Sequence, residues 1–187
     1  AQYPTLDMLT DRVNSILPLN IIAGNPLMEQ CTVHQISGTY RKTNVTKGSH
    51  FEIGLTTKYI HNFIGQSSWF YTEDTPATTA GGVDYLIPAG ATVRSFENMD
   101  GSLSAKFESK YSAHSRKLKS KLNFRIAADY NSLPYMNQGE KHVTESITPL
   151  FRFDYQSNFS KVFRMNLSSA TSYYNSWGTM DTERLSE

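Results

Sequence analysis

Oppositely charged side chains two residues apart are the first candidates for chemistry in this sequence, at Glu108/Lys110 and Arg152/Asp154. Such pairs can serve general acid–base catalysis when a site places them beside a reacting group. The same spacing also puts both members on one face of a β-strand. Because both pairs lie in alternating segments, we interpret them as charges on the polar face of a sheet, neutralised across strands.

Histidine and cysteine offer no recognisable site. The single cysteine, Cys31, excludes an intrachain disulfide and a cysteine metal cluster. Metal ligands come in groups of three or four, and no two histidines have ligand spacing. Gly-x-Ser-x-Gly, phosphate-loop and His-Glu-x-x-His motifs are absent from the sequence. We therefore predict no enzyme activity, no cofactor and no metal. The histidines are His34, His50, His61, His114 and His142.

An aromatic cluster, "SSWFY" at 67–71, is the strongest candidate for a binding surface. Trp69, Phe70 and Tyr71, with Tyr85 further on, are candidate contacts for a sugar or a siderophore in an exposed loop. The competing interpretation is a belt of aromatic residues at a membrane–water interface, which recurs in membrane β-barrels. We favour the belt.

Bulk composition limits the class of protein. The formal net charge of +1 over 187 residues gives no field that favours nucleic acid. No apolar run approaches the ~18 residues of a membrane-spanning helix. A membrane β-barrel is still allowed, because its signal is spread over short alternating segments.

Alternation of apolar and polar residues predicts six strands. They cover roughly 33–43, 51–63, 102–113, 122–130, a segment that ends at Tyr155, and 161–174. Several reach the 9–11 residues of a tilted membrane-spanning strand. We predict that the apolar positions face lipid and the charged positions face a polar lumen. The predicted lipid-facing residues are Phe51, Ile53, Leu55, Tyr59, Leu103, Phe107, Leu122, Phe124, Ile126, Phe151, Phe153, Phe163, Met165 and Leu167.

The predicted connections alternate in length. Short turns at 44–49, 114–121 and 156–160 separate the longer irregular segments at 65–101 and 131–145. Outer-membrane barrels have short periplasmic turns and long extracellular loops, whereas a soluble β-sandwich has no reason to keep this order. The pattern therefore favours an antiparallel transmembrane β-barrel over a sandwich.

Short motifs in the right order resemble a family of proteins. The motifs are Pro4, Thr5, Leu6 and Leu9; Pro18 to Ile21; Gly24 to Leu27; Asn98, Asp100 and Gly101; and Ser132, Pro134, Asn137, Gly139, Glu140 and Thr144. Together they resemble the outer-membrane β-barrel family that accompanies TonB-dependent receptors in Bacteroidetes-type bacteria. Asn98, Asp100 and Gly101 correspond to the start of a barrel strand in that family.

The resemblance implies a transport barrel in the bacterial outer membrane that imports a scarce nutrient. Its implied partners are outer-membrane lipid and lipopolysaccharide, the rest of its own barrel and plug, TonB and a surface lipoprotein, without nucleic acid. The alternatives are an outer-membrane assembly, secretion or adhesion component without transport, and a soluble β-sandwich binding module.

Six strands are fewer than the eight of the smallest outer-membrane barrels, so we expect 1–187 to be part of one larger barrel domain. We expect 1–32 to be an irregular extracellular segment. Strands and loops should occupy 33–177, and 178–187 should begin the next loop. The plug domain is not expected within this sequence.

Overall fold

The computed structural model describes residues 4–10, 13–78, 82, 84–115, 117, 119–158 and 164–180. Strands dominate these residues, and the only helix among them is the single-turn α1, Leu6–Leu9. The predicted all-β class is therefore confirmed.

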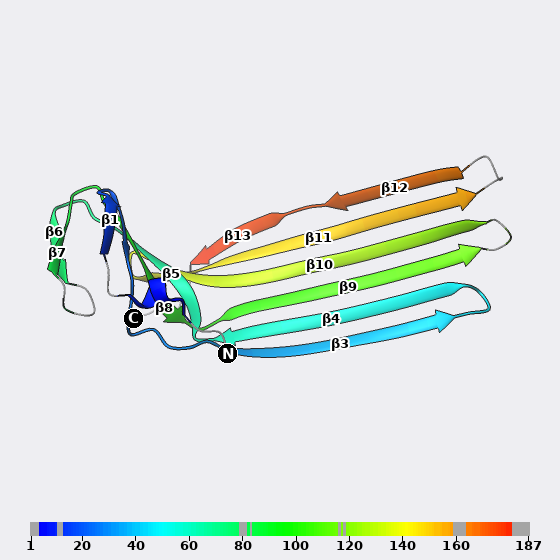
Figure 1. The fold of residues 1–187 in the computed structure, drawn as a ribbon, viewed down its shortest axis with the longest axis horizontal. Coiled ribbons are helices and arrows are strands. Elements are labelled where there is room, and N and C mark those ends of the chain that lie inside the picture. Colours follow the sequence, from blue (N-terminus) through cyan, green and yellow to red (C-terminus); the bar gives the residue numbers. More distant parts are fainter. Residues whose placement is uncertain are drawn as a thin grey trace.

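Long antiparallel strands form most of the molecule, and we call them together the long-strand sheet. They lie side by side in the order β3-β4-β9-β10-β11, and both β12 and β13 pair with β11 (Figure 1). The predicted strands are present, and several are longer than expected. The bounds are β3 Thr32–Asn44, β4 Ser49–His61, β9 Ser102–Ser115, β10 Ser120–Asn137, β11 Glu140–Asn158, β12 Arg164–Ser172 and β13 Asn175–Met180.

Short connections gather at one end of this sheet, which we call the turn end (Figure 1). β3 and β4 are joined by four residues, where Gly48 takes the left-handed conformation with φ of 62°. β9 ends at Ser115 and β10 begins at Ser120, and the last pair of β11 with β12 is Asn158 with Arg164. The three predicted short turns thus lie on the same side of the molecule.

The opposite end carries a small folded unit, the cap, where the sequence predicted irregular chain at 1–32 and 65–101. That prediction is wrong for most of 65–101 and for part of 1–32, because these parts form strands. Strands of four to eight residues are too short to give a readable alternation. The cap comprises α1, β1 Val13–Leu17, β2 Asn20–Ala23, β5 Phe63–Phe70, β6 Thr75–Thr78, β7 Asp84–Ile87 and β8 Thr92–Met99.

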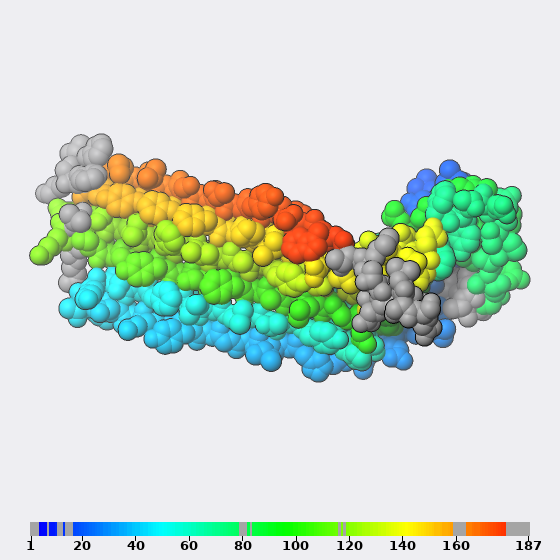
Figure 2. Space-filling view, turned by 180° about the vertical axis from the view of Figure 1, so that it is seen from behind, coloured from blue at the N-terminus to red at the C-terminus, as the bar shows by residue number. Residues whose placement is uncertain are grey.

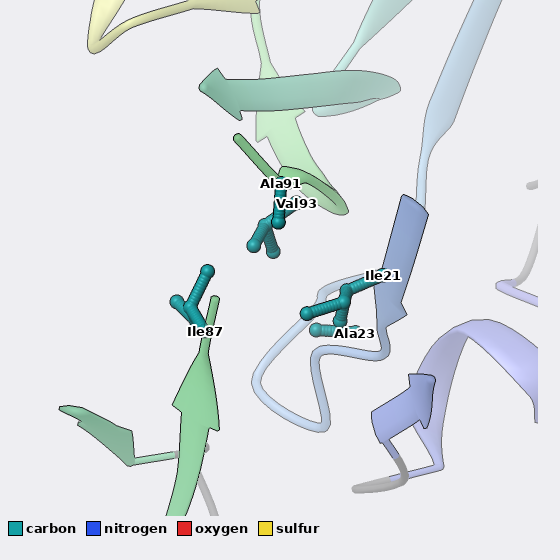
Figure 3. Packing of buried hydrophobic residues seen from close by; sticks show 5 residues of the cluster. All are labelled: Ile21, Ala23, Ile87, Ala91 and Val93. Atoms are coloured by element: carbon teal, nitrogen blue, oxygen red, sulfur yellow. The ribbon is translucent and has the colours of Figure 1, made fainter. Parts of the chain in front are cut away.

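The cap has its own small core. Side chains from β2, β7 and β8, with Ala91 just before β8, point into one shared space (Figure 3). Parallel pairing of β2 with β8 and antiparallel pairing of β5 with β8 bring these elements together. The buried residues of this core are Ile21, Ala23, Ile87, Ala91 and Val93.

The predicted loop at 131–145 is also wrong. β10 and β11 continue through it in register as far as Asn137 opposite Glu140. Only Gln138 and Gly139 remain as the turn, with φ of 53° and 80°. Two positive φ values in a two-residue connection are typical of a tight hairpin whose twist matches its strands. The C-terminal prediction is corrected too, since 178–180 belong to β13 and not to a loop.

The long-strand sheet is a single open layer. Figures 1 and 2, from opposite sides, show a broad slab with β3 and β4 along one margin and β11 and β12 along the other. Within the described ranges, β3 pairs only with β4, and the sheet does not close into a barrel. Nor do these residues supply the second packed sheet of a β-sandwich.

Candidate functional site

Strand register sorts the side chains of the long-strand sheet into an apolar face and a polar face. Residues directly opposite each other in a sheet project to the same side. Leu55 is opposite Phe107, and Phe107 is opposite Ala128. The same register places every predicted lipid-facing residue that the structure describes on the apolar face. Phe163 lies outside the described residues.

The apolar face is open to the surroundings of the chain. Leu55 and Leu167 are each 55% exposed, and Phe151 is 42% exposed. Phe124 makes edge-to-face contacts with Phe151 and Phe153, with ring centroids 4.9 and 6.3 Å apart. A contiguous apolar patch over several strands is uncommon on a monomeric soluble protein and marks a protein or membrane contact.

A band without full charges crosses the apolar face. Toward the turn end it is bounded by Lys42, which is opposite Phe51, and toward the cap by Glu145, in the same cross-strand row as Tyr59. Between these rows, no described residue on this face is Asp, Glu, Lys or Arg. From Phe51 to Tyr59 the strand advances about 26 Å at ~3.3 Å per residue.

Glu145 is the one carboxylate at the cap boundary of this band, and two aromatic side chains satisfy it. The Tyr130 hydroxyl and the Trp177 indole N–H each donate a hydrogen bond to Glu145, both at 2.6 Å. Trp177 is also the register partner of Glu145 across β11 and β13. Sequence reasoning missed this cluster, although Glu145 falls on the apolar parity of β11 and Trp177 is one of only two tryptophans.

Ion pairs run across four strands on the polar face. Glu52 accepts a hydrogen bond from Arg41 at 2.7 Å and lies 3.7 Å from the Lys110 ammonium. Lys110 lies 2.8 Å from Glu108, which also pairs with Arg125. Three cations therefore share two carboxylates along β3, β4, β9 and β10.

The interpretation of the i, i+2 charges as strand-face pairs is confirmed. Glu108 and Lys110 form one of the ion pairs above, and Arg152 donates to Asp154 at 3.0 Å. Each of these acids is occupied by a base on the same face. The geometry of these pairs is that of charge neutralisation along a polar wall.

The four predicted ligand-contact aromatics serve different packing roles. Tyr71 and Tyr85 pack against the cap core, and burial raises the pKa of the Tyr85 hydroxyl, with nearby Tyr71 adding to the shift. Trp69 lies against the β10–β11 hairpin, where a Cβ on Gly139 would come within 2.7 Å of the indole ring. Phe70 is 53% exposed.

Backbone contacts hold the β10–β11 hairpin against the cap. The Gln138 N–H donates to the Ser68 carbonyl at 2.9 Å, and the Ser68 hydroxyl donates to the Asn137 side chain at 3.1 Å. A short parallel pairing joins Ser68 with Asn137 in the sheet. The cap and the long-strand sheet are thus directly connected at β5 and β10.

A second connection, at the base of the cap, uses the Asn-x-Asp-Gly motif. The Asn98 side chain accepts from the Glu29 N–H at 2.7 Å and donates to the carbonyls of Glu29 and Asn62, each at 3.0 Å. Asp100 accepts from the Asn62 N–H at 2.8 Å and pairs with His61. These bonds fix the interruption between β4 and β5 at Asn62, with φ of 54°, and between β8 and β9 at Gly101, with φ of 102°, while the antiparallel register continues on both sides.

The described ranges contain neither a group of metal ligands nor a helix that could span a membrane. No three His, Cys, Asp or Glu side chains there are grouped as ligands of a metal ion. Among the same residues, no helix is long and apolar enough to cross a membrane.

The fold defines an all-β protein built on one amphipathic antiparallel sheet with a cap at one end. Comparisons with protein-family models, curated protein sequences and solved structures found no match to this chain. The candidate functional surfaces are therefore defined by the two faces of the sheet alone.

Proposed function

We propose that this chain forms part of the wall of an outer-membrane transport barrel, of the kind that imports a nutrient with energy from TonB. The observation that carries the proposal is the band without full charges between Lys42 and Glu145. Barrels of this class have an apolar outer band about 25 Å tall. At a strand tilt of ~40°, the 26 Å path from Phe51 to Tyr59 covers about 20 Å of membrane depth.

The polar face supports the same proposal. In a barrel, this face lines an aqueous lumen, where Arg41, Glu52 and Lys110 stay hydrated. The opposite orientation would bury these charges in hydrocarbon, which is costly for each of them. A soluble sandwich accommodates the same two faces only with a second sheet on the phenylalanines.

The proposal orients the protein in the membrane. Short turns in such barrels are periplasmic, so the turn end faces the periplasm and the cap faces outward. Tyr59, Tyr130 and Trp177 then occupy the outer aromatic belt, next to Glu145. Ser68, opposite Asn137, lies about 16 Å beyond the Ser132 row at ~3.3 Å per residue, so the next residue, Trp69, lies above the belt and in the extracellular region.

In a membrane barrel, both edge strands of the sheet must be paired. An unpaired strand edge in lipid leaves backbone N–H and C=O groups without partners, at several kcal/mol each. β3 and β12 must therefore pair with further strands in the membrane-embedded protein. Those strands and the plug are the partners that the proposal requires.

Vesicle flotation tests the membrane assignment. The purified protein, refolded with vesicles of outer-membrane lipid, should float with them, and protease should remove the cap while the long strands stay protected. A protein that folds as a monomer in detergent-free buffer and stays in the bottom fraction, apart from the floating vesicles, would contradict the membrane assignment.

Uptake in cells tests transport separately. Import that depends on this protein should stop when the TonB protein is removed. Import that persists would indicate a transport barrel that does not depend on TonB. A strain that lacks this protein and loses envelope integrity but no uptake would favour an assembly role.

A further inference from the structure

Positive charge exceeds negative charge on the polar face of the long-strand sheet. Apart from the end of the β10–β11 hairpin, every carboxylate on this face within the described strands has a cationic partner. These carboxylates are Glu52, Glu108, Asp129 and Asp154. The cations that the register places on the same face are Arg41, Lys58, Lys106, Lys110, Lys121, Arg125, Arg152 and Arg164. The face therefore carries more cations than its own acids neutralise.

Two of these lysines lie close together near the middle of the sheet. Lys58 is opposite Ser104, and Lys106 is two residues along the same strand, on the same face. Diagonal neighbours of this kind have backbones ~7–8 Å apart, within reach of two long side chains. Their ammonium groups can therefore converge on one acceptor.

Only one carboxylate of the described residues, Asp129, competes for these two ammonium groups. The Lys106 ammonium is 3.6 Å from the Asp129 carboxylate, a long distance for an ion pair. Among the described lysine–carboxylate pairs, only that of Lys110 with Glu52, at 3.7 Å, is longer. Among the described residues, no carboxylate pairs with Lys58. In contrast, Arg41, Lys110 and Arg125 are already engaged by Glu52 and Glu108.

A recess of about 460 Å³ surrounds the two lysines. The Asp129 carboxylate, 3.6 Å from Lys106, also lines it. Neutral polar side chains line most of the rest, and each can donate a hydrogen bond to an oxygen atom. These side chains are Gln35, Thr56, Ser104, Asn131 and Thr148. Two cations against one carboxylate leave the hollow with a net positive charge, and with several neutral donors they form a good environment for an oxyanion.

We propose that the Lys58–Lys106 recess binds a doubly charged oxyanion group, of the phosphate or sulfate kind, on the transported solute. The inference rests on the proposed function, because the polar face lines a lumen only in a barrel. Lysine suits such a role as a compact point charge on a flexible stem. Release is also possible, because the recess is open to the lumen and solvent there weakens each contact.

Calorimetric titrations with inorganic pyrophosphate and, separately, with sulfate test the site directly, on the protein folded in detergent micelles at low ionic strength. The unsubstituted protein should bind at least one of these probes in a salt-sensitive manner. Lys58→Gln and Lys106→Gln should each weaken binding about tenfold or more, as expected for losing a charged hydrogen bond. Lys58→Arg, which keeps the charge, should restore most of the affinity.

Lys121→Gln is the matched control, since Lys121 is on the same face but near the turn end, two residues into β10. It should leave the affinity within about twofold, an effect of long-range charge alone. Absence of pyrophosphate and sulfate binding, or equal losses in all three Lys→Gln variants, would overturn the proposal. Circular dichroism of each variant verifies that the sheet is intact.

The two proposals fail separately. Binding with this variant pattern in a protein that folds without membrane supports the anion site and contradicts its place in a lumen. A protein that floats with vesicles but binds neither probe supports the barrel and contradicts the anion site.

Discussion

Single residues at the boundaries of the sheet carry much of the account, and Glu145 is the clearest. It lies on the apolar face, yet it accepts hydrogen bonds from Tyr130 and Trp177. A carboxylate at this depth is tolerable because two aromatic donors with apolar bodies satisfy it. The cluster thus ties the last strand to the sheet and marks where the apolar band ends.

Trp177→Phe removes one of the two donors and keeps the aromatic ring. We expect a lower urea midpoint for unfolding from vesicles, because Glu145 then keeps an unsatisfied oxygen on the apolar face. Glu145→Gln should behave similarly, because the two donors bond to different oxygens and the amide has only one accepting oxygen. Tryptophan fluorescence of the remaining Trp69 reports the transition, and Trp69→Phe, read by circular dichroism, is the control.

Gly139→Ala should destabilise the hairpin for two reasons. The left-handed conformation, with φ of 80°, costs about 1–2 kcal/mol for a residue with a Cβ. The added methyl would also meet the Trp69 ring at 2.7 Å.

The matched control for Gly139→Ala is Gly38→Ala in β3. Gly38 has ordinary φ, and a Cβ there meets nothing within 4 Å. Urea unfolding should give a loss for Gly139→Ala and little or no loss for Gly38→Ala. Equal midpoints for the two variants would contradict the hairpin geometry.

At the scale of elements, the sequence predicted the strands that lie within the apolar band and missed those outside it. β4 and β9 alternate because one face is apolar and the other charged over their whole length. The outer halves of β10 and β11 extend beyond the band, and there Leu133 and Tyr135 are exposed whereas Ser132 and Pro134 are buried, so hydrophobicity does not follow burial. Pro134, Gly139 and several polar residues then looked like a loop.

The cap was unpredictable for a different reason. Its strands are short, and pairings such as β2 with β8 join segments about 70 residues apart, which local pattern cannot reveal. Its motif residues were noticed, since Asn98, Asp100 and Gly101 were singled out by resemblance. The hydrogen bonds of Asn98 and Asp100 to Glu29 and Asn62 give those two residues a structural role where β4 meets β5 and β8 meets β9.

Asn98→Ala tests whether this motif attaches the cap to the sheet. The change removes three hydrogen bonds, from the Glu29 N–H and to the carbonyls of Glu29 and Asn62, each worth about 0.5–1.5 kcal/mol. We expect faster amide hydrogen exchange at 25–31 and at 62, with the long strands unaffected. Asn123→Ala, on the polar face of β10, is the control, and matching exchange in both variants would contradict this role.

For the whole molecule, the central claim is that the two faces of the sheet meet different media. Phe124→Arg should prevent folding in the membrane, at roughly 2–4 kcal/mol near the midplane. Asn123→Arg makes the same substitution one residue away, on the polar face, and should be mild. Folding yield in vesicles compares the two variants, and similar losses in both would contradict the assignment of faces.

Fluorescence quenching by lipids brominated on their acyl chains tests the claim most directly. Both native tryptophans are replaced by Phe, and one new tryptophan is placed on either face of β9, as Phe107→Trp or Lys106→Trp. We predict strong quenching of the tryptophan at 107 by brominated lipid, and quenching of the tryptophan at 106 by aqueous iodide alone. Equal quenching of both positions by lipid, or of neither, would contradict the account.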